Sequence, residues 1–129
     1  MTLDVFLESF DEFDRDAAEV ALARNGIGED DAPVETADGG YALVTVDDDT
    51  CTFFITSLTP DLAQIILDVA RAARLAILPA DGTATTILPR RLDVPDDLEP
   101  VRVRTGAQLY EALRQSVTRR EAIRGTPSA

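Results

Sequence analysis

Three consecutive carboxylates, Asp47, Asp48 and Asp49, form the densest group of side chains in the sequence that could do chemistry. Hard cations such as Ca²⁺ bind several carboxylate oxygens at once, so the run raises the question of a metal site. A calcium loop alternates its ligands and needs a glycine and a distant Glu, and VDDDTC has none of that spacing. Asp is also a favoured turn residue. We therefore interpret the run as a hairpin turn and predict no metal and no other cofactor.

The residues that usually carry catalysis are scarce. The sequence contains no histidine, which removes the commonest general base and every Ser–His or Cys–His nucleophile pair. Cys51 follows the acidic turn, where carboxylates disfavour the reactive thiolate, so we interpret it as structural. The glycines Gly26 and Gly28 follow a predicted helix, whereas a dinucleotide site needs a strand before its glycines. We predict a non-enzymatic protein, and an enzyme with two carboxylates across a cleft stays an open alternative.

Two arginine pairs have a spacing that could clamp an anion. Arg90 and Arg91 are adjacent in a proline-rich stretch, and Arg102 and Arg104 fall on one face of a short predicted strand. Neutralisation of the acidic part of the chain within the fold is the simpler role. We favour that role for both pairs.

Charge is distributed unevenly along the chain. The 24 acidic and 12 basic residues give a net charge of -12, and every basic residue is arginine. Residues 1–50 hold 15 acids and two arginines, a net -13, while residues 51–129 hold 9 acids and 10 arginines, a net +1. Nucleic acid is a poor partner for such a chain, because its binding needs cations on phosphates. Adaptation to salt and a solvated acidic helix are the alternative explanations of this acidity. Adaptation to salt would spread the acids evenly, so their concentration favours a surface with a binding role.

The elements that must position these residues centre on a helix between strands. Alternating and β-branched sequence predicts four strands, Tyr41–Val46, Cys51–Ser57, Leu75–Leu78 and Ala84–Leu88. The intervening helix, Asp61–Arg74, begins after Thr59 and Pro60, a capping residue and a favoured first-turn residue. Its apolar stripe consists of Leu62, Ile65, Ile66, Val69 and Ala73. A helix with one apolar side needs a sheet to cover.

The flanking segments predict further helices. From Leu3 to Asn25 the apolar spacing predicts one helix of about six turns with the aromatic residues Phe6, Phe10 and Phe13 in the core, and a break near Ser9 is the competing interpretation. Residues 26–40 are predicted as a loop with a short edge strand at Val34–Thr36.

The last third of the chain predicts a hairpin, a loop, a strand and a helix. Asp81-Gly82 predicts a hairpin, residues 89–100 a surface loop, and Val101–Arg104 a half-exposed strand. Thr105 and Gln108 form a capping box for a last helix. The apolar side of that helix consists of Leu109, Leu113 and Val117.

These elements predict an α+β fold. We expect a mainly antiparallel sheet of four to six strands, with the central helix packed on one face and flanking N- and C-terminal helices. Residues 1–124 are predicted as a single domain and residues 125–129 as a disordered tail. The first residues, MTLDVFLESF, show neither a secretion signal nor a membrane span, which predicts a cytoplasmic protein.

The element order of helix, strands, helix, strands and helix, together with acidity and size, resembles two kinds of small bacterial binding protein. One kind is the immunity proteins that neutralise toxins, and the other is the dimeric chaperones of secreted effectors. The resemblance rests on the stripe in LAQIILDVA and the acidic first segment, and it includes no motif that transfers a functional residue. The strand at Val101 and the proline-rich loop depart from the chaperone order.

The resemblance and the charge together predict binding to a basic protein, a toxin or an effector, and no binding to nucleic acid or membrane. Whether the chain acts as a monomer or a homodimer stays open at this point. The predicted partner-binding residues are the clustered acids Asp11, Glu12, Asp30, Asp31, Asp47, Asp48 and Asp49. Many enzymes that attack nucleic acids are basic around the active site, and carboxylates can occupy the cleft where phosphates would lie.

Overall fold

The computed structural model describes residues 3–9, 13–27, 32–47, 49–80, 86–88 and 101–125, with side chains of the last segment described up to Ser116. Within these residues the chain forms an α+β fold of three helices and a seven-stranded sheet. The elements are β1 (Leu3–Glu8), α1 (Arg15–Arg24), β2 (Ala32–Glu35), β3 (Tyr41–Val46), β4 (Thr50–Ser57), α2 (Pro60–Ala73), β5 (Ala76–Pro79), β6 (Ile87–Leu88), β7 (Val101–Arg102) and α3 (Gly106–Gly125).

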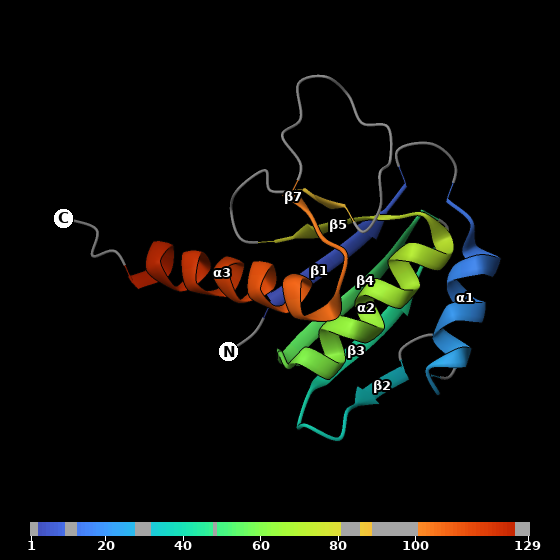
Figure 1. Ribbon diagram of the computed structural model, residues 1–129, viewed down its shortest axis with the longest axis horizontal. Coiled ribbons are helices and arrows are strands. Elements are labelled where there is room, and N and C mark those ends of the chain that lie inside the picture. The colour runs from blue at the N-terminus through green and yellow to red at the C-terminus, as the bar shows by residue number, and fades with distance from the viewer. Residues whose placement is uncertain are drawn as a thin grey trace.

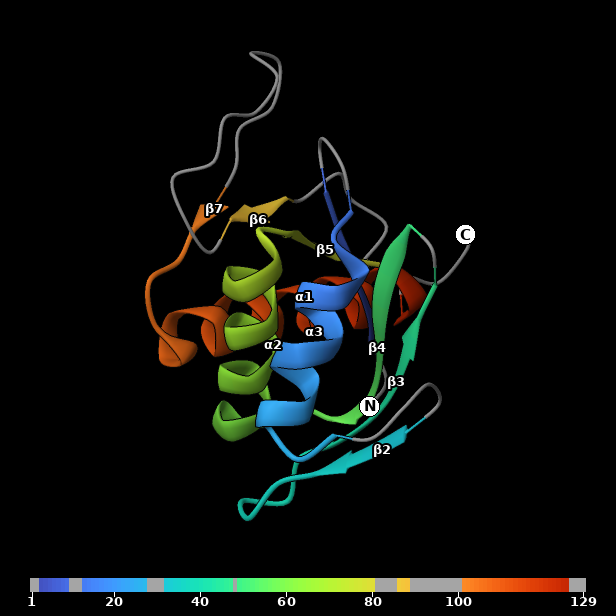
Figure 2. The same ribbon diagram turned by 90° about the vertical axis from the view of Figure 1, so that its right-hand side faces the viewer.

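The sheet has the strand order β2-β3-β4-β1-β5-β6-β7. All neighbouring pairs are antiparallel except β6 and β7, which run parallel. Helices α1 and α2 lie side by side over one face of the sheet, and α3 packs against α2 (Figures 1 and 2). The prediction of a mainly antiparallel α+β fold is confirmed, although the sheet has one strand more than the upper expectation.

The structure corrects the prediction for the first segment. Residues Leu3–Glu8 form the central strand β1, and α1 begins only at Arg15, so the single long helix is wrong. The segment fits the helical stripe through Phe6 on which the prediction rested, and it also fits an alternation through Val5 that the prediction did not use. Pairing with β4 on one side and β5 on the other decides the matter, because a strand between two neighbours bonds its backbone on both edges.

The three aromatic residues predicted to share one side of that helix do not belong to one element. Phe6 points to the sheet face opposite the buried residues of β1 and is only partly buried, so its predicted place in the core is wrong. Phe13 packs partly buried against the core just before α1. Phe10 lies outside the described residues. The competing interpretation, a break into two helices near Ser9, is also wrong, because the first element is the strand Leu3–Glu8 and the helix begins at Arg15.

Helix α2 agrees with its prediction. Thr59 accepts a hydrogen bond from the Leu62 N–H at 3.3 Å, and Pro60 occupies the first turn. The helix ends at Arg74, whose φ of 57° lies in the left-handed region. Ile65 of the apolar stripe is partly buried. The other four stripe residues are buried, namely Leu62, Ile66, Val69 and Ala73. The sheet face beneath the helices supplies the rest of the core, through Leu3, Val5, Leu7, Val44, Phe53 and Ile55.

Most of the remaining elements follow their sequence signals. Helix α1 ends at Asn25 and Gly26, where Gly26 has the expected positive φ of 75°. The edge strand β2 forms one to two residues earlier than predicted, and β5 pairs antiparallel with β6, although the predicted turn between them lies outside the described residues. The Thr105 hydroxyl accepts from the Gln108 N–H at 3.2 Å at the start of α3. The predicted tail overlaps α3 at residue 125.

Candidate functional site

The predicted acidic surface is only partly within the described residues. Asp47 and Asp49 are both exposed between β3 and β4, and the Asp47 N–H donates to the Thr50 carbonyl at 2.8 Å, which confirms the hairpin turn. The other predicted partner-binding residues, Asp11, Glu12, Asp30, Asp31 and Asp48, lie outside the described residues.

The tertiary structure adds an acidic residue beside this turn. Glu8, at the end of β1, is exposed and lies opposite Thr50 on β4, and the Thr50 hydroxyl donates to Glu8 Oε1 at 3.3 Å. The sequence interpretation missed Glu8 as a neighbour of the turn because it placed this segment in a helix. In the part of the chain that the structure describes, no three acidic or cysteine side chains converge in a way that could hold a metal ion.

The sheet face away from α1 and α2 carries a second, apolar feature. Leu43 on β3 and Phe54 on β4 pair directly across the strands and are 43% and 41% exposed. Phe6 on β1 pairs with Leu78 on β5, both partly buried, and Phe6 is the diagonal neighbour of Phe54 because Phe54 pairs with Asp4. Pro33 on β2 pairs with Leu43 and is exposed. We call these five residues the open-face patch: Pro33, Leu43, Phe54, Phe6 and Leu78.

A signal for this patch exists in the sequence. In a strand, successive side chains point to opposite faces, so the adjacent residues Phe53 and Phe54 cannot both be buried by one helix layer. Phe53 is fully buried under the helices, and Phe54 is therefore on the uncovered side. Recognition of the patch also requires β1 to be a strand, because Phe6 belongs to it.

Asp38, in the connection from β2 to β3, is tied to the start of α2. Its carboxylate accepts hydrogen bonds from the Thr36 hydroxyl and, at 3.1 Å, from the Asp61 N–H, and the two threonine hydroxyls of Thr36 and Thr59 lie 3.2 Å apart. Desolvation raises the pKa of Asp38, but hydrogen bonds from Thr36, Thr59 and the backbone outweigh it and lower the pKa from 3.8 to about 2. This carboxylate occupies the N-terminus of α2, where it has a structural role.

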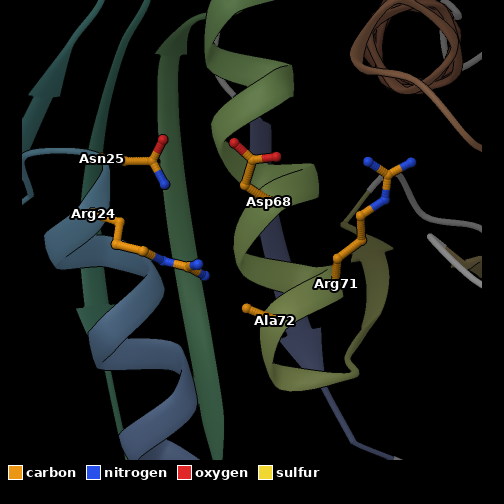
Figure 3. Close-up of a pocket in the computed structure, with 5 residues that line it drawn as sticks. All are labelled: Arg24, Asn25, Asp68, Arg71 and Ala72. Carbon is orange, nitrogen blue, oxygen red and sulfur yellow. The ribbon is translucent and has the colours of Figure 1, made fainter.

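An open pocket of about 440 Å³ lies between the C-terminal end of α1 and the C-terminal half of α2 and is lined by Arg24, Asn25, Asp68, Arg71 and Ala72 (Figure 3). Its polar groups are largely used within the fold. The Asn25 amide donates to the Ala21 carbonyl at 2.8 Å, Asp68 accepts from Gln64 at 3.0 Å, and Arg71 donates to the Arg104 carbonyl. In Figure 3 the side chain of Arg71 points away from Arg24, so the two guanidinium groups do not converge on one ligand.

The other sequence candidates have simple structural explanations where they are described. Cys51 is fully buried on the helix-covered side of β4, as its structural interpretation predicts. Arg102 and Arg104 are exposed, but only Arg102 belongs to β7, and the Arg104 N–H donates to Gln108 at 2.7 Å in the cap of α3. Arg90 and Arg91 lie outside the described residues.

Comparison of the chain with protein-family models, with curated proteins and with solved structures finds no match. Among the described helices, none is both long and apolar enough to cross a membrane. The site must therefore be judged on its own geometry.

Proposed function

We propose that this chain is a non-enzymatic, acidic protein-binding module of the immunity or inhibitor type, and that it binds a basic protein. The observation that carries the proposal is the separation of charge in space. The described acids of the first 50 residues lie on β1, α1, β2, their connections and the β3–β4 turn, with Arg15 and Arg24 as the only basic residues of that part of the sequence. Of the exposed arginines after residue 50, Arg102, Arg104 and Arg114 lie on β7, α3 and the segment between them, and Arg74 lies at the end of α2.

The strand order turns this sequence asymmetry into a spatial one. Strands β2 and β3 form one side of the sheet, β7 forms the other edge, and β1 with Asp4 and Glu8 lies between them. In Figure 1 helix α1 lies at the right of the molecule and α3 at the left, while β2 and its connection to β3 lie at the bottom. A basic partner approaching the acidic side would be attracted over a distance of about 10 Å at moderate salt, which speeds the encounter.

Co-expression with the neighbouring open reading frame of the source organism tests this proposal. We expect the neighbour to encode a basic protein that slows growth, and we expect this chain to restore growth. The association rate should fall as ionic strength rises, because charges steer the encounter.

A pair of charge reversals locates the acidic surface. Asp49→Arg should slow association with the basic protein, and Asp47→Arg combined with it should slow association further, with little change in melting temperature because both residues are exposed. The matched control is Glu111→Arg on α3, an exposed residue with the same change in charge. Binding that ignores both ionic strength and the Asp47 and Asp49 reversals would show that the acidity serves only solubility or salt adaptation.

A dimeric chaperone for a secreted effector is the second candidate, and the exposed open-face patch favours it. Chaperones of this kind offer apolar surface to a client, and exposed apolar area also promotes dimers. Light scattering over a range of concentrations separates the candidates. A monomer agrees with the inhibitor proposal, whereas an obligate dimer favours the chaperone.

A further inference from the structure

We propose that the open-face patch is the surface on which the basic partner docks, an inference that rests on the proposed function and names its contact site. The partner would present apolar side chains to the patch and Arg or Lys side chains to the carboxylates around it. The acidic turn would then attract the partner, and the patch would hold it.

The shape of the patch suits a protein partner. Each of five neighbouring strands contributes one side chain, in the order β2, β3, β4, β1 and β5, so the patch crosses the sheet, with a diagonal step of two residues between Phe54 and Phe6. Two of its exposed members, Leu43 and Phe54, pair directly. The strand backbones are held by sheet pairing and, on the far side, by the helix-covered core, so the surface is already ordered before binding and little entropy is lost there.

Charge complementarity identifies the partner as basic. Strands β1 to β5 contain no arginine and no lysine. They contain the acids Asp4, Glu8 and Glu35, and strand alternation places all three on the same face as the patch. Asp4 pairs directly with Phe54, so a carboxylate adjoins the exposed ring. An apolar centre with an acidic border matches a partner with apolar side chains bordered by cations.

The same charges argue against a second copy of this chain as the occupant. Two copies placed face to face would bring Asp4, Glu8 and Glu35 of one protomer against the same residues of the other. The five strands β1, β2, β3, β4 and β5 themselves contain no cationic side chain that could lie between these acids. Each copy also carries a net charge of -12. Juxtaposed like charges are costly at an interface.

Three synthetic peptides probe the two components of binding. One alternates Leu and Arg, one alternates Ser and Arg, and one alternates Leu and Glu, and binding is followed by fluorescence anisotropy of a labelled peptide. We expect the Leu/Arg peptide to bind most tightly, the Ser/Arg peptide weakly, and the Leu/Glu peptide not at all. Amide chemical-shift changes on adding the Leu/Arg peptide should concentrate on β1, β3 and β4.

The decisive variant is Leu43→Ser combined with Phe54→Ser. It should weaken the Leu/Arg peptide at least about tenfold, the scale of losing a central apolar anchor, and leave the Ser/Arg peptide unchanged. The matched control is Val20→Ser combined with Val101→Ser, which removes exposed apolar side chains from α1 and β7 instead. That control should bind all three peptides as the wild-type protein does.

The outcomes separate this inference from the proposed function. If Leu/Arg and Ser/Arg peptides bind equally, or if the Leu43 and Phe54 variant binds the Leu/Arg peptide normally, the docking inference is wrong while an acidic binding function stands. Failure of the Leu/Arg peptide to bind the wild-type protein also overturns the docking inference, whereas only the co-expression and charge-reversal experiments decide the proposed function. A wild-type dimer that the Leu43 and Phe54 variant converts to a monomer would assign the patch to a second copy and also overturn the inference.

Discussion

The two faces of the central sheet differ although they are built from the same strands. In β1 the residues Leu3, Val5 and Leu7 are buried under the helix layer, while the alternate residues Asp4, Phe6 and Glu8 face the other way and keep contact with solvent. The covered face is uniformly apolar, and the open face mixes apolar side chains with acids. The covered face therefore stabilises the fold, and the open face leaves Leu43 and Phe54 accessible to solvent.

The difference in burial has an energetic consequence. Apolar area removed from water stabilises by roughly 25 cal/mol per Å², so a fully buried side chain contributes its whole area and a half-exposed one only part of it. Substitutions on the covered face should change stability, and substitutions on the open face should change binding.

The largest effect is expected from a charge placed under the helix layer. Ile66 on α2 is fully buried, so Ile66→Asp would bury a carboxylate with no partner and lower the free energy of unfolding by about 5 kcal/mol. Urea denaturation followed by circular dichroism measures the loss. The exposed residue Val20 supplies the control, since Val20→Asp should change stability by about 0.5 kcal/mol or less. An unchanged melting temperature for Ile66→Asp would contradict the packing of α2.

Substitution of two adjacent phenylalanines compares how much each face of the sheet contributes to stability. Phe53 is fully buried on the covered face and Phe54 is 41% exposed on the open face. Phe53→Ala should lower the free energy of unfolding by about 3–5 kcal/mol, because it leaves a cavity in the core, whereas Phe54→Ala should cost about 1 kcal/mol. Denaturant melts of the two variants give both values. Equal losses would show that the open face is covered in solution.

The hydrogen bonds that Asp38, in the β2–β3 connection, accepts at the start of α2 should stabilise the fold in a pH-dependent way. Because the folded-state pKa of Asp38 is lowered from 3.8 to about 2, its contribution to stability is fully present above pH 3.8 and is lost as the pH falls through about 2. Asp38→Asn should therefore lower the melting temperature at neutral pH. The difference from the wild-type protein should shrink across this acid range, and a difference that stays constant down to pH 2 would rule out the carboxylate as its source.

The smallest effect is expected at the end of α2. Arg74 has a φ of 57°, a conformation that glycine adopts without steric cost, so Arg74→Gly should stabilise the protein by up to about 1 kcal/mol. The same change at Arg71, inside the helix, should destabilise by about 1 kcal/mol. Opposite signs of the two melting-temperature shifts would confirm the left-handed end of α2, and equal signs would contradict it.

The sequence by itself determined the elements whose signals are local. Thr59, Pro60 and an apolar stripe define α2 within one segment, and the alternation on both sides of Asp47 to Asp49 defines the β3–β4 hairpin. Capping hydrogen bonds, proline geometry and helical spacing act between residues a few positions apart, so they can be recognised without the rest of the chain. The acidity of the first 50 residues is likewise a property of sequence alone.

Only the tertiary structure decided the identity of β1 and the location of the candidate binding surface. The first segment fits two periodicities, and its insertion between β4 and β5, strands that are 42 or more residues later in the chain, makes it a strand. That insertion brings Glu8 to the acidic turn and Phe6 beside Phe54. Which face of the sheet stays open depends on where α1 and α2 pack, and no local pattern contains that information, because burial is a relation between distant segments.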